Sequence, residues 1–224
     1  MAIFPIVFQN DEIIIVNKPN GVSVQGGAGI SHPLDKELSA QLGYPLHLVH
    51  RLDKETSGLL VVAKNAASAA KWTGLIAGGQ VKKEYSAICI GLPVSGKKSF
   101  GAGQKGALRD LVFAHGREQP AELFFTVEST ASLPEVAMSF LKIRLGTGRM
   151  HQIRIQLAKA SCPIAADDQH GNFKLNKILR RYGIKRLCLA ATKITLPLDG
   201  GTQEFSVPLP EHMQRALEAC GLSE

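Results

Sequence analysis

The sequence has 224 residues, of which 45% are apolar and 20% charged. These values belong to a soluble globular protein, long enough for a full hydrophobic core. Lys and Arg outnumber Asp and Glu by 26 to 19, and the resulting net charge of +7 favours a polyanionic partner.

The cysteines give no sign of a zinc site or a disulfide framework. Cys89, Cys162, Cys188 and Cys220 are scattered and form no Cys-x-x-Cys pair. The start of the chain lacks a charged region followed by an apolar one, and no apolar run is long enough to span a bilayer. We therefore expect a cytoplasmic protein with reduced thiols.

The first part of the chain predicts a strand, a turn and a helix. β-Branched residues make Ile13–Val16 a buried strand, which ends at the turn residues 17–21. Leucines at helical spacing predict a helix over residues 31–42, with Ser31 as its cap and Pro33 in its first turn.

The next stretch, His50-Arg51-Leu52-Asp53-Lys54-Glu55-Thr56-Ser57-Gly58-Leu59-Leu60, sets a carboxylate between two cations. Positive charge on Arg51 and Lys54 favours the ionised form of Asp53, which can serve as a nucleophile or general base. The hydroxyls and glycine that follow can pin the loop before an apolar strand begins at Leu59. A surface loop with an ion pair is the alternative, and it is the commoner explanation of a bare Arg-x-Asp.

A helix over Ala66–Ile76, closed by a glycine pair, and a strand over Val81–Ile90 are predicted next. Trp72 in the helix is expected to pack in the core. Tyr85 lies on one face of the strand, where a tyrosine more often packs than takes part in chemistry.

The middle of the chain has weaker patterns. Residues 93–120 are rich in glycine and basic side chains, and we expect surface loops with at most one short strand. Contact with RNA phosphates and simple solvation are both open for this segment. Residues 123–127 and 136–145 predict strands, joined through the turn-rich residues 129–134.

Gly146-Thr147-Gly148-Arg149-Met150-His151-Gln152-Ile153-Arg154 leads from a glycine turn into a predicted helix over residues 150–160. Such a basic helix start is either a phosphate cradle or a solvated face. The densest basic cluster of the chain follows at residues 174–186, where RNA contact and solvation are again both open. Strands over 187–196 and 204–207 and a helix over 210–219 complete the prediction.

Several motifs together resemble the RluA family of pseudouridine synthases. His-Arg-Leu-Asp-x-x-Thr-Ser-Gly-Leu-Leu is similar to the family signature, and Asn-Lys-Pro-x-Gly, Lys-x-Tyr-x-Ala and Thr-Gly-Arg-x-His-Gln-Ile-Arg resemble further family motifs. Residues 163–167 resemble its Pro-Ile-x-Gly-Asp element, and His170-Gly171 with Asn176 is most similar to the tRNA-modifying branch. The chain departs from the family pattern at Gln156, Cys162, Ala166 and Ala190.

The resemblance implies an α+β fold, with residues 1–224 forming one catalytic domain around a mixed, largely antiparallel central sheet with flanking helices. The residues before Ile13 leave no room for the small RNA-binding domain that many relatives carry, so we expect no separate N-terminal RNA-binding domain. The implied reaction is the isomerisation of uridine to pseudouridine in tRNA or rRNA by a monomer, without metal or cofactor. The alternatives are a catalytically inactive RNA-binding protein of the same fold and, less favoured, a glycoside hydrolase, which would need a second acid close to Asp53.

The resemblance also assigns roles to residues. Asp53 is the catalytic carboxylate, Tyr85 stacks on the target base, and Arg154 pairs with Asp53. The expected RNA-binding residues are Arg51, Lys54, Arg149, His151, Lys174 and Lys177.

Overall fold

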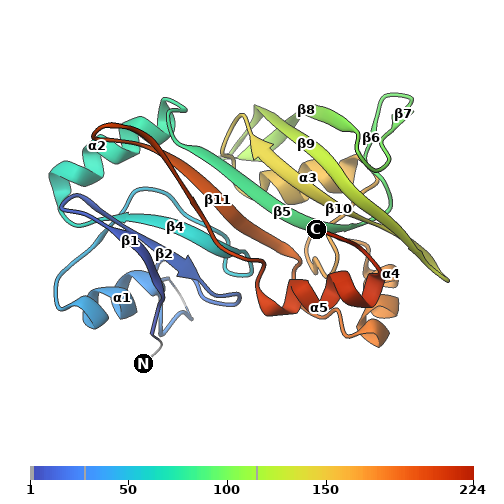
Figure 1. The fold of residues 1–224 in the computed structure, drawn as a ribbon, viewed down its shortest axis with the longest axis horizontal. Coiled ribbons are helices and arrows are strands. Elements are labelled where there is room, and N and C mark those ends of the chain that lie inside the picture. Colours follow the sequence, from blue (N-terminus) through green and yellow to red (C-terminus); the bar gives the residue numbers. More distant parts are fainter. Residues whose placement is uncertain (1–2, 28, 115) are drawn as a thin grey trace. The chain divides into compact units, whose positions relative to one another are not determined.

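The computed structural model describes residues 3–27, 29–114 and 116–224, and Figure 1 labels its strands and helices. These elements fall into two units. The first unit runs to Lys83 and resumes over Ala191–Pro208, and the second comprises Glu84–Ala190 and Leu209–Glu224. None of the described helices is long and apolar enough to cross a membrane.

β-Branched residues build the sheet of the first unit, as predicted. Strands β1 (Ile6–Gln9), β2 (Ile13–Lys18) and β4 (Ser57–Ala63) pair antiparallel in that order. The short β3 (His47–Leu48) also pairs with β4, and β11 (Leu189–Leu198) pairs with β12 (Gly201–Ser206). All seven residues of β4 are buried, so the loop that precedes β4 is fastened to the core at its downstream end.

Among its described residues, this unit has two helices. In α2 (Ala66–Ala77) the side chain of Asn65 caps the first turn, and Trp72 is buried, as predicted. Helix α1 (Leu34–Leu42) begins later than predicted, and Ser31 does not cap it. Pro33 occupies the N-cap position, and the first two helical amides instead donate to the carbonyls of Ser23 and Val24.

Four long strands form the sheet of the second unit. They are β5 (Lys82–Ile90, in this unit from Glu84), β10 (Val136–Leu145), β9 (Arg117–Leu133) and β8 (Lys105–Ala114), and neighbours in this order pair antiparallel. A small hairpin joins β6 (Val94–Ser95) to β7 (Lys98–Ser99). The predicted α+β fold with a mixed, largely antiparallel sheet is confirmed.

Two predictions for the middle of the chain are wrong. Residues 93–120, of which residue 115 lies outside the described part, contain all of β8 and the start of β9 instead of loops. The alternation of apolar and polar residues that is typical of a strand is hidden in β8. Asp110 lies on the inner side with Leu108 and Val112, while Leu111 and Phe113 face outward. Residues 129–133 continue β9, where pairing with β10 overrides their turn-forming composition.

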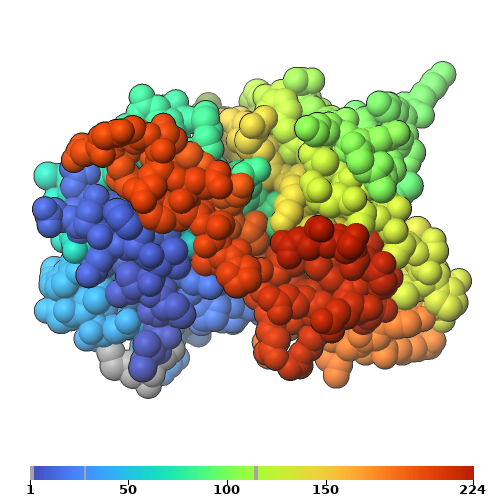
Figure 2. Space-filling view, viewed as in Figure 1, coloured from blue at the N-terminus to red at the C-terminus, as the bar shows by residue number. Residues whose placement is uncertain are grey.

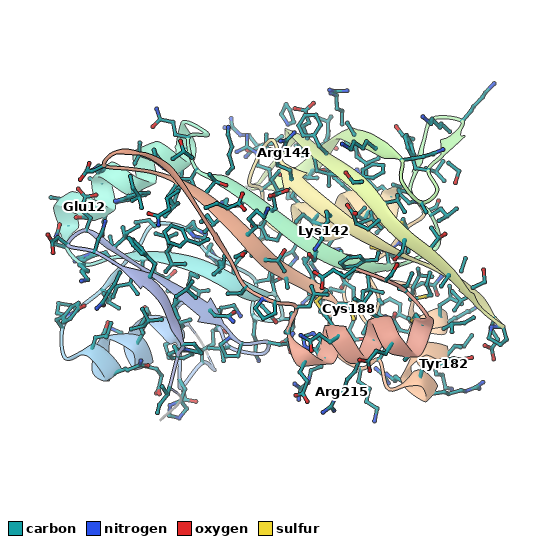
Figure 3. All side chains as sticks on the ribbon, in the orientation of Figure 1. Glu12, Lys142, Arg144, Tyr182, Cys188 and Arg215 are labelled. Atoms are coloured by element: carbon teal, nitrogen blue, oxygen red, sulfur yellow. The ribbon has the colours of Figure 1, made fainter. Side chains whose placement is uncertain are left out.

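The helices of the second unit are α3 (Gln152–Lys159), α4 (Phe173–Leu179), the single 3₁₀ turn η1 (Arg180–Tyr182) and α5 (Glu211–Cys220). Helix α3 begins two residues later than predicted, because His151 has a φ of 52° and cannot belong to a right-handed helix. The turn η1 contacts both α4 and α5. In the space-filling view the orange surface of the segment that contains α4 lies beside the red surface of α5 (Figure 2). All four cysteines are free and buried, and Cys188 is labelled in Figure 3.

Candidate active site

The loop that carries Asp53 lies between β3 and β4 in the first unit. Asp53 is half-buried, whereas its neighbours Arg51 and Lys54 are exposed. The amide of Thr56 donates to the carbonyl of Asp53 at 3.1 Å and closes a turn. Gly58 then enters β4 with a φ of 107°, and a Cβ there would collide with the backbone of Ala191. The loop therefore has a tight turn at Asp53 and a position that only glycine fits.

A buried lysine donates hydrogen bonds to the backbone of this loop and of the turn that follows β2. Lys18, at the end of β2, is 0% exposed, and its Nζ donates to the carbonyls of Pro19, Val22 and Lys54 at 3.0, 2.7 and 2.9 Å. Burial lowers the pKa of Lys18 from 10.5 to about 8, while the carboxylates of Glu55 and Asp53 oppose the shift. The side chain of Asn20 also donates to the carbonyl of Glu55. The backbone just after Asp53, at Lys54 and Glu55, is thus held by side chains of the Asn-Lys-Pro turn.

His50, upstream of Asp53, is a structural residue. Its Nε2 accepts a hydrogen bond from the amide of Val61 at 3.0 Å. Burial, with the charge of nearby Lys83 adding to it, lowers the pKa of His50 from 6.5 to about 3. A neutral imidazole that accepts at Nε2 carries its proton on Nδ1. His50 therefore ties the start of the Asp53 loop to β4 and stays uncharged at neutral pH.

In the second unit, Arg154 lies on α3 and is 5% exposed. It binds the buried carboxylate of Asp167 with two parallel bonds, Nε to Oδ2 at 2.8 Å and Nη2 to Oδ1 at 2.7 Å. Burial raises the pKa of Asp167, but the bonds from Arg154 and from the amides of His170 and Gln169 outweigh it and lower the pKa below 3.8. The result is a guanidinium held in a fixed orientation by an ionised carboxylate.

A chain of amide side chains anchors the helix that carries Arg154. Thr147 donates to Gln152 at 2.7 Å, and Gln152 donates to the carbonyl of Glu122 and to Gln156. Gln156 in turn donates to the carbonyls of Leu108 and Ala121, at 3.2 and 3.1 Å. Gln156, one of the departures from the family pattern, thus fastens α3 to β8 and β9.

Other predicted site residues also belong to the second unit. Tyr85 is 6% exposed in β5, opposite Ile143 of β10. His151 is half-buried, and its Nδ1 lies 2.9 Å from Nε2 of His170. Arg149 is exposed in the turn before α3, and Lys174 and Lys177 are exposed on α4.

The structure assigns functional weight to two residues that sequence reasoning had left aside. The sequence places Asp167 in an element that resembles Pro-Ile-x-Gly-Asp and Lys18 in one that resembles Asn-Lys-Pro-x-Gly, but it predicts neither the bond from Lys18 to the Asp53 loop nor the pairing of Asp167 with Arg154. One signal for Lys18 is present in the sequence: it is a lysine at the end of a strand of buried β-branched residues. A lysine buried there needs hydrogen-bond acceptors, so its position predicts backbone partners nearby. No group of three or more His, Cys, Asp or Glu that could hold a metal ion occurs among residues 3–27, 29–114 and 116–224.

Comparisons with known proteins identify the family. The model of the RNA pseudouridylate synthase family matches residues 12–159. The ribosomal large subunit pseudouridine synthase C of Haemophilus influenzae is 32% identical over 221 residues, covering 95% of this chain and 67% of that protein. The protein of the same name from Escherichia coli K12 is 33% identical over 223 residues, covering 95% of this chain and 69% of that protein.

Solved structures show the same fold. Human RNA Pseudouridylate Synthase Domain Containing 4 superposes with a TM-score of 0.75 at 23% identity, covering 98% of this chain and 94% of that chain. Human RNA Pseudouridylate Synthase Domain Containing 1 gives a TM-score of 0.72 at 21% identity, covering 92% and 83%. The predicted family resemblance is confirmed: the chain belongs to the RluA family of RNA pseudouridine synthases, which are isomerases.

Proposed function

We propose that this chain converts uridine to pseudouridine in ribosomal or transfer RNA, with the carboxylate of Asp53 as the catalytic group. The observation that carries the proposal is the fixed loop around Asp53. Its backbone is held by Lys18 on one side and by His50 on the other, while the carboxylate itself stays half-buried. A positioned, solvent-reachable carboxylate suits attack on a sugar or base, or removal of a proton.

Tyr85 and Arg154 complete the proposed catalytic set. The target nucleotide must leave its stack, which costs a few kcal/mol. In the proposal the ring of Tyr85 stacks on the extruded base, and Arg154, oriented by Asp167, pairs with the carboxylate of Asp53. We propose that residues 1–224 work as one catalytic domain, as the family resemblance implies.

The exposed basic residues are proposed to hold the RNA. Arg51 takes the place of the extruded base, while Lys54, Arg149 and His151 contact the backbone near it. Lys174 and Lys177 contact phosphates further away. The isomerisation rearranges bonds within one nucleoside and needs no redox group, and we propose that the enzyme acts in the cytoplasm as a monomer without a cofactor.

The relatives guide the choice of substrate. Those named above are synthases of the ribosomal large subunit, which makes large-subunit rRNA the first RNA to test and tRNA the second. Incubation of the protein with in vitro transcripts of both, followed by mapping of pseudouridine by carbodiimide modification and primer extension, identifies the substrate. Modified uridines at defined positions are expected; RNA binding without any pseudouridine would favour the inactive RNA-binding protein.

A further inference from the structure

The net positive charge of the chain is concentrated in one short segment. Residues 172–186 contain six Lys and Arg and no Asp or Glu, whereas the rest of the chain has 20 basic residues against 19 acidic ones. This segment comprises α4, η1 and the residues that follow them. Almost all of the excess charge that favours a polyanionic partner therefore lies at one place in the second unit.

The fold turns these charges toward solvent. Asn176 and Leu179 are the buried residues of α4, whereas Lys174, Lys177 and Arg181 are exposed and follow one another at intervals of three and four residues. Phe173 lies four residues before Lys177, and 63% of it is exposed. We call Phe173, Lys174, Lys177, Arg180 and Arg181 the basic stripe; it ends at η1, where Tyr182 is labelled in Figure 3.

Few carboxylates lie close enough to the described residues of the stripe to neutralise its positive charge. In the part of the chain that the structure describes, neither Lys174 nor Lys177 has an ion pair. Arg180 and Arg181 approach the carboxylates of Asp168 and Glu135 only at 3.7 and 3.9 Å, and all four of these side chains are more than 40% exposed. Such long, solvated pairs contribute little.

Hydrogen bonds also fix the helix that carries the stripe. The side chain of Asn172 caps α4 by accepting from the amide of Leu175 at 3.1 Å. Asn176, on the buried face, accepts from the amide of Ala166 and donates to the carbonyl of Asp167, both at 3.0 Å. Because Asp167 is also the partner of Arg154, the helix that carries the stripe is attached directly to the segment that orients this arginine.

We propose that the basic stripe binds a single-stranded segment of the substrate RNA, with Phe173 stacked on an unpaired base and Lys174, Lys177 and Arg181 on neighbouring phosphates. The eight residues from Lys174 to Arg181 span about 10 Å, enough for two or three phosphates. An exposed aromatic ring among solvated cations is the combination that binds single-stranded nucleic acid. A base inside a duplex would offer no free face to Phe173. The inference extends the proposed function, on which it rests.

Binding of a fluorescein-labelled oligouridine, measured by fluorescence anisotropy at several KCl concentrations, tests the stripe. K174A/K177A is expected to reduce the slope of log affinity against log salt by about 1.4, since each lost phosphate contact in a single strand contributes about 0.7. F173A is expected to weaken binding by roughly 5- to 100-fold with an unchanged slope, and F173Y to restore it.

Matched controls remove the same groups elsewhere. K36A/K82A removes two exposed lysines of the first unit, and F113A removes a phenylalanine of similar exposure, 66%, from β8. Both are expected to bind like the wild type. Stripe variants that behave like these controls would overturn the inference, as would equal loss on a blunt-ended RNA duplex. Because binding is measured without turnover, a wild type that makes no pseudouridine would overturn the proposed function alone.

Discussion

Replacement of Lys18 by methionine probes how the Asp53 loop is held. Lys18→Met keeps most of the side-chain volume but removes the ammonium group. The carbonyls of Pro19, Val22 and Lys54 then lose this donor. Of the three, the carbonyl of Lys54 keeps a bond from the amide of Gly21, at 3.0 Å. The residue directly after Asp53 is therefore loosened without any change to the carboxylate.

The expected loss of stability follows from two opposing effects. The carbonyls of Pro19 and Val22 lose a donor at a cost of about 1–3 kcal/mol each, whereas the carbonyl of Lys54 keeps its bond from Gly21. Against this, the variant no longer buries an ammonium, whose penalty is about 3 kcal/mol if the pKa falls from 10.5 to about 8. We expect a net loss of about 1 kcal/mol in the free energy of unfolding, together with a lower rate constant for pseudouridine formation.

Urea unfolding followed by circular dichroism, and a single-turnover assay, measure the two effects. Lys83→Met is the matched control: Lys83 is half-buried and burial lowers its pKa too, but none of the described residues accepts a hydrogen bond from its ammonium. That variant should keep or gain stability. If Lys18→Met unfolds at the same urea concentration as Lys83→Met and turns over like the wild type, the loop does not depend on this lysine.

The pKa of Lys18 also predicts a dependence on pH. Its value is lower in the folded chain than in the unfolded one, so the unfolded chain binds more protons between about pH 8 and pH 10.5. The stability that this group contributes therefore rises with pH across that window. The difference in free energy of unfolding between wild type and Lys18→Met should grow by about 3 kcal/mol over the same range. A difference that shrinks with rising pH would show that the sign is wrong.

Two further variants test the second unit. Asp167→Asn removes the carboxylate that binds and orients the buried guanidinium of Arg154, and it should destabilise the protein by about 3–5 kcal/mol in urea unfolding. Since the pKa of Asp167 is lowered, the wild-type advantage should be present above about pH 4 and disappear as the pH falls below it; an advantage that persists in acid would contradict the assignment. Ala166→Gly should raise the thermal unfolding midpoint. Ala166 has a φ of 58° in a buried turn, and glycine adopts this backbone conformation at a free-energy cost up to about 1 kcal/mol lower than alanine. A lower midpoint would show that the packing of the alanine methyl group contributes more than the relief of backbone strain.

Much of the fold could be predicted because local patterns agreed with tertiary structure. The β-branched run at Ile13 and the apolar run at Leu59 both became buried strands. Strand β8 was missed since its inner face carries a glycine and an aspartate while two large apolar residues face outward. Its pairing with β9 is a tertiary effect that local sequence does not encode.

The candidate site was predictable to different degrees in different places. The motif around Asp53 and the helix with Arg154 could be found from residue order alone. The bonds from Lys18 to Lys54, and from Arg154 to Asp167, join residues 36 and 13 positions apart, and they depend on how strands and turns come together. Neither periodicity nor composition contains that information, so these partners emerged only from the structure.

The most direct test of the central claim is the rate at which tritium is released from C5 of uridine in a large-subunit rRNA transcript under single-turnover conditions, because the new carbon–carbon bond displaces that hydrogen. Asp53→Asn should lower this rate at least about 100-fold, whereas Glu55→Gln, which removes the other carboxylate of the same loop, should leave it within a few-fold of the wild type. Equal rates for Asp53→Asn and the wild type would contradict the account.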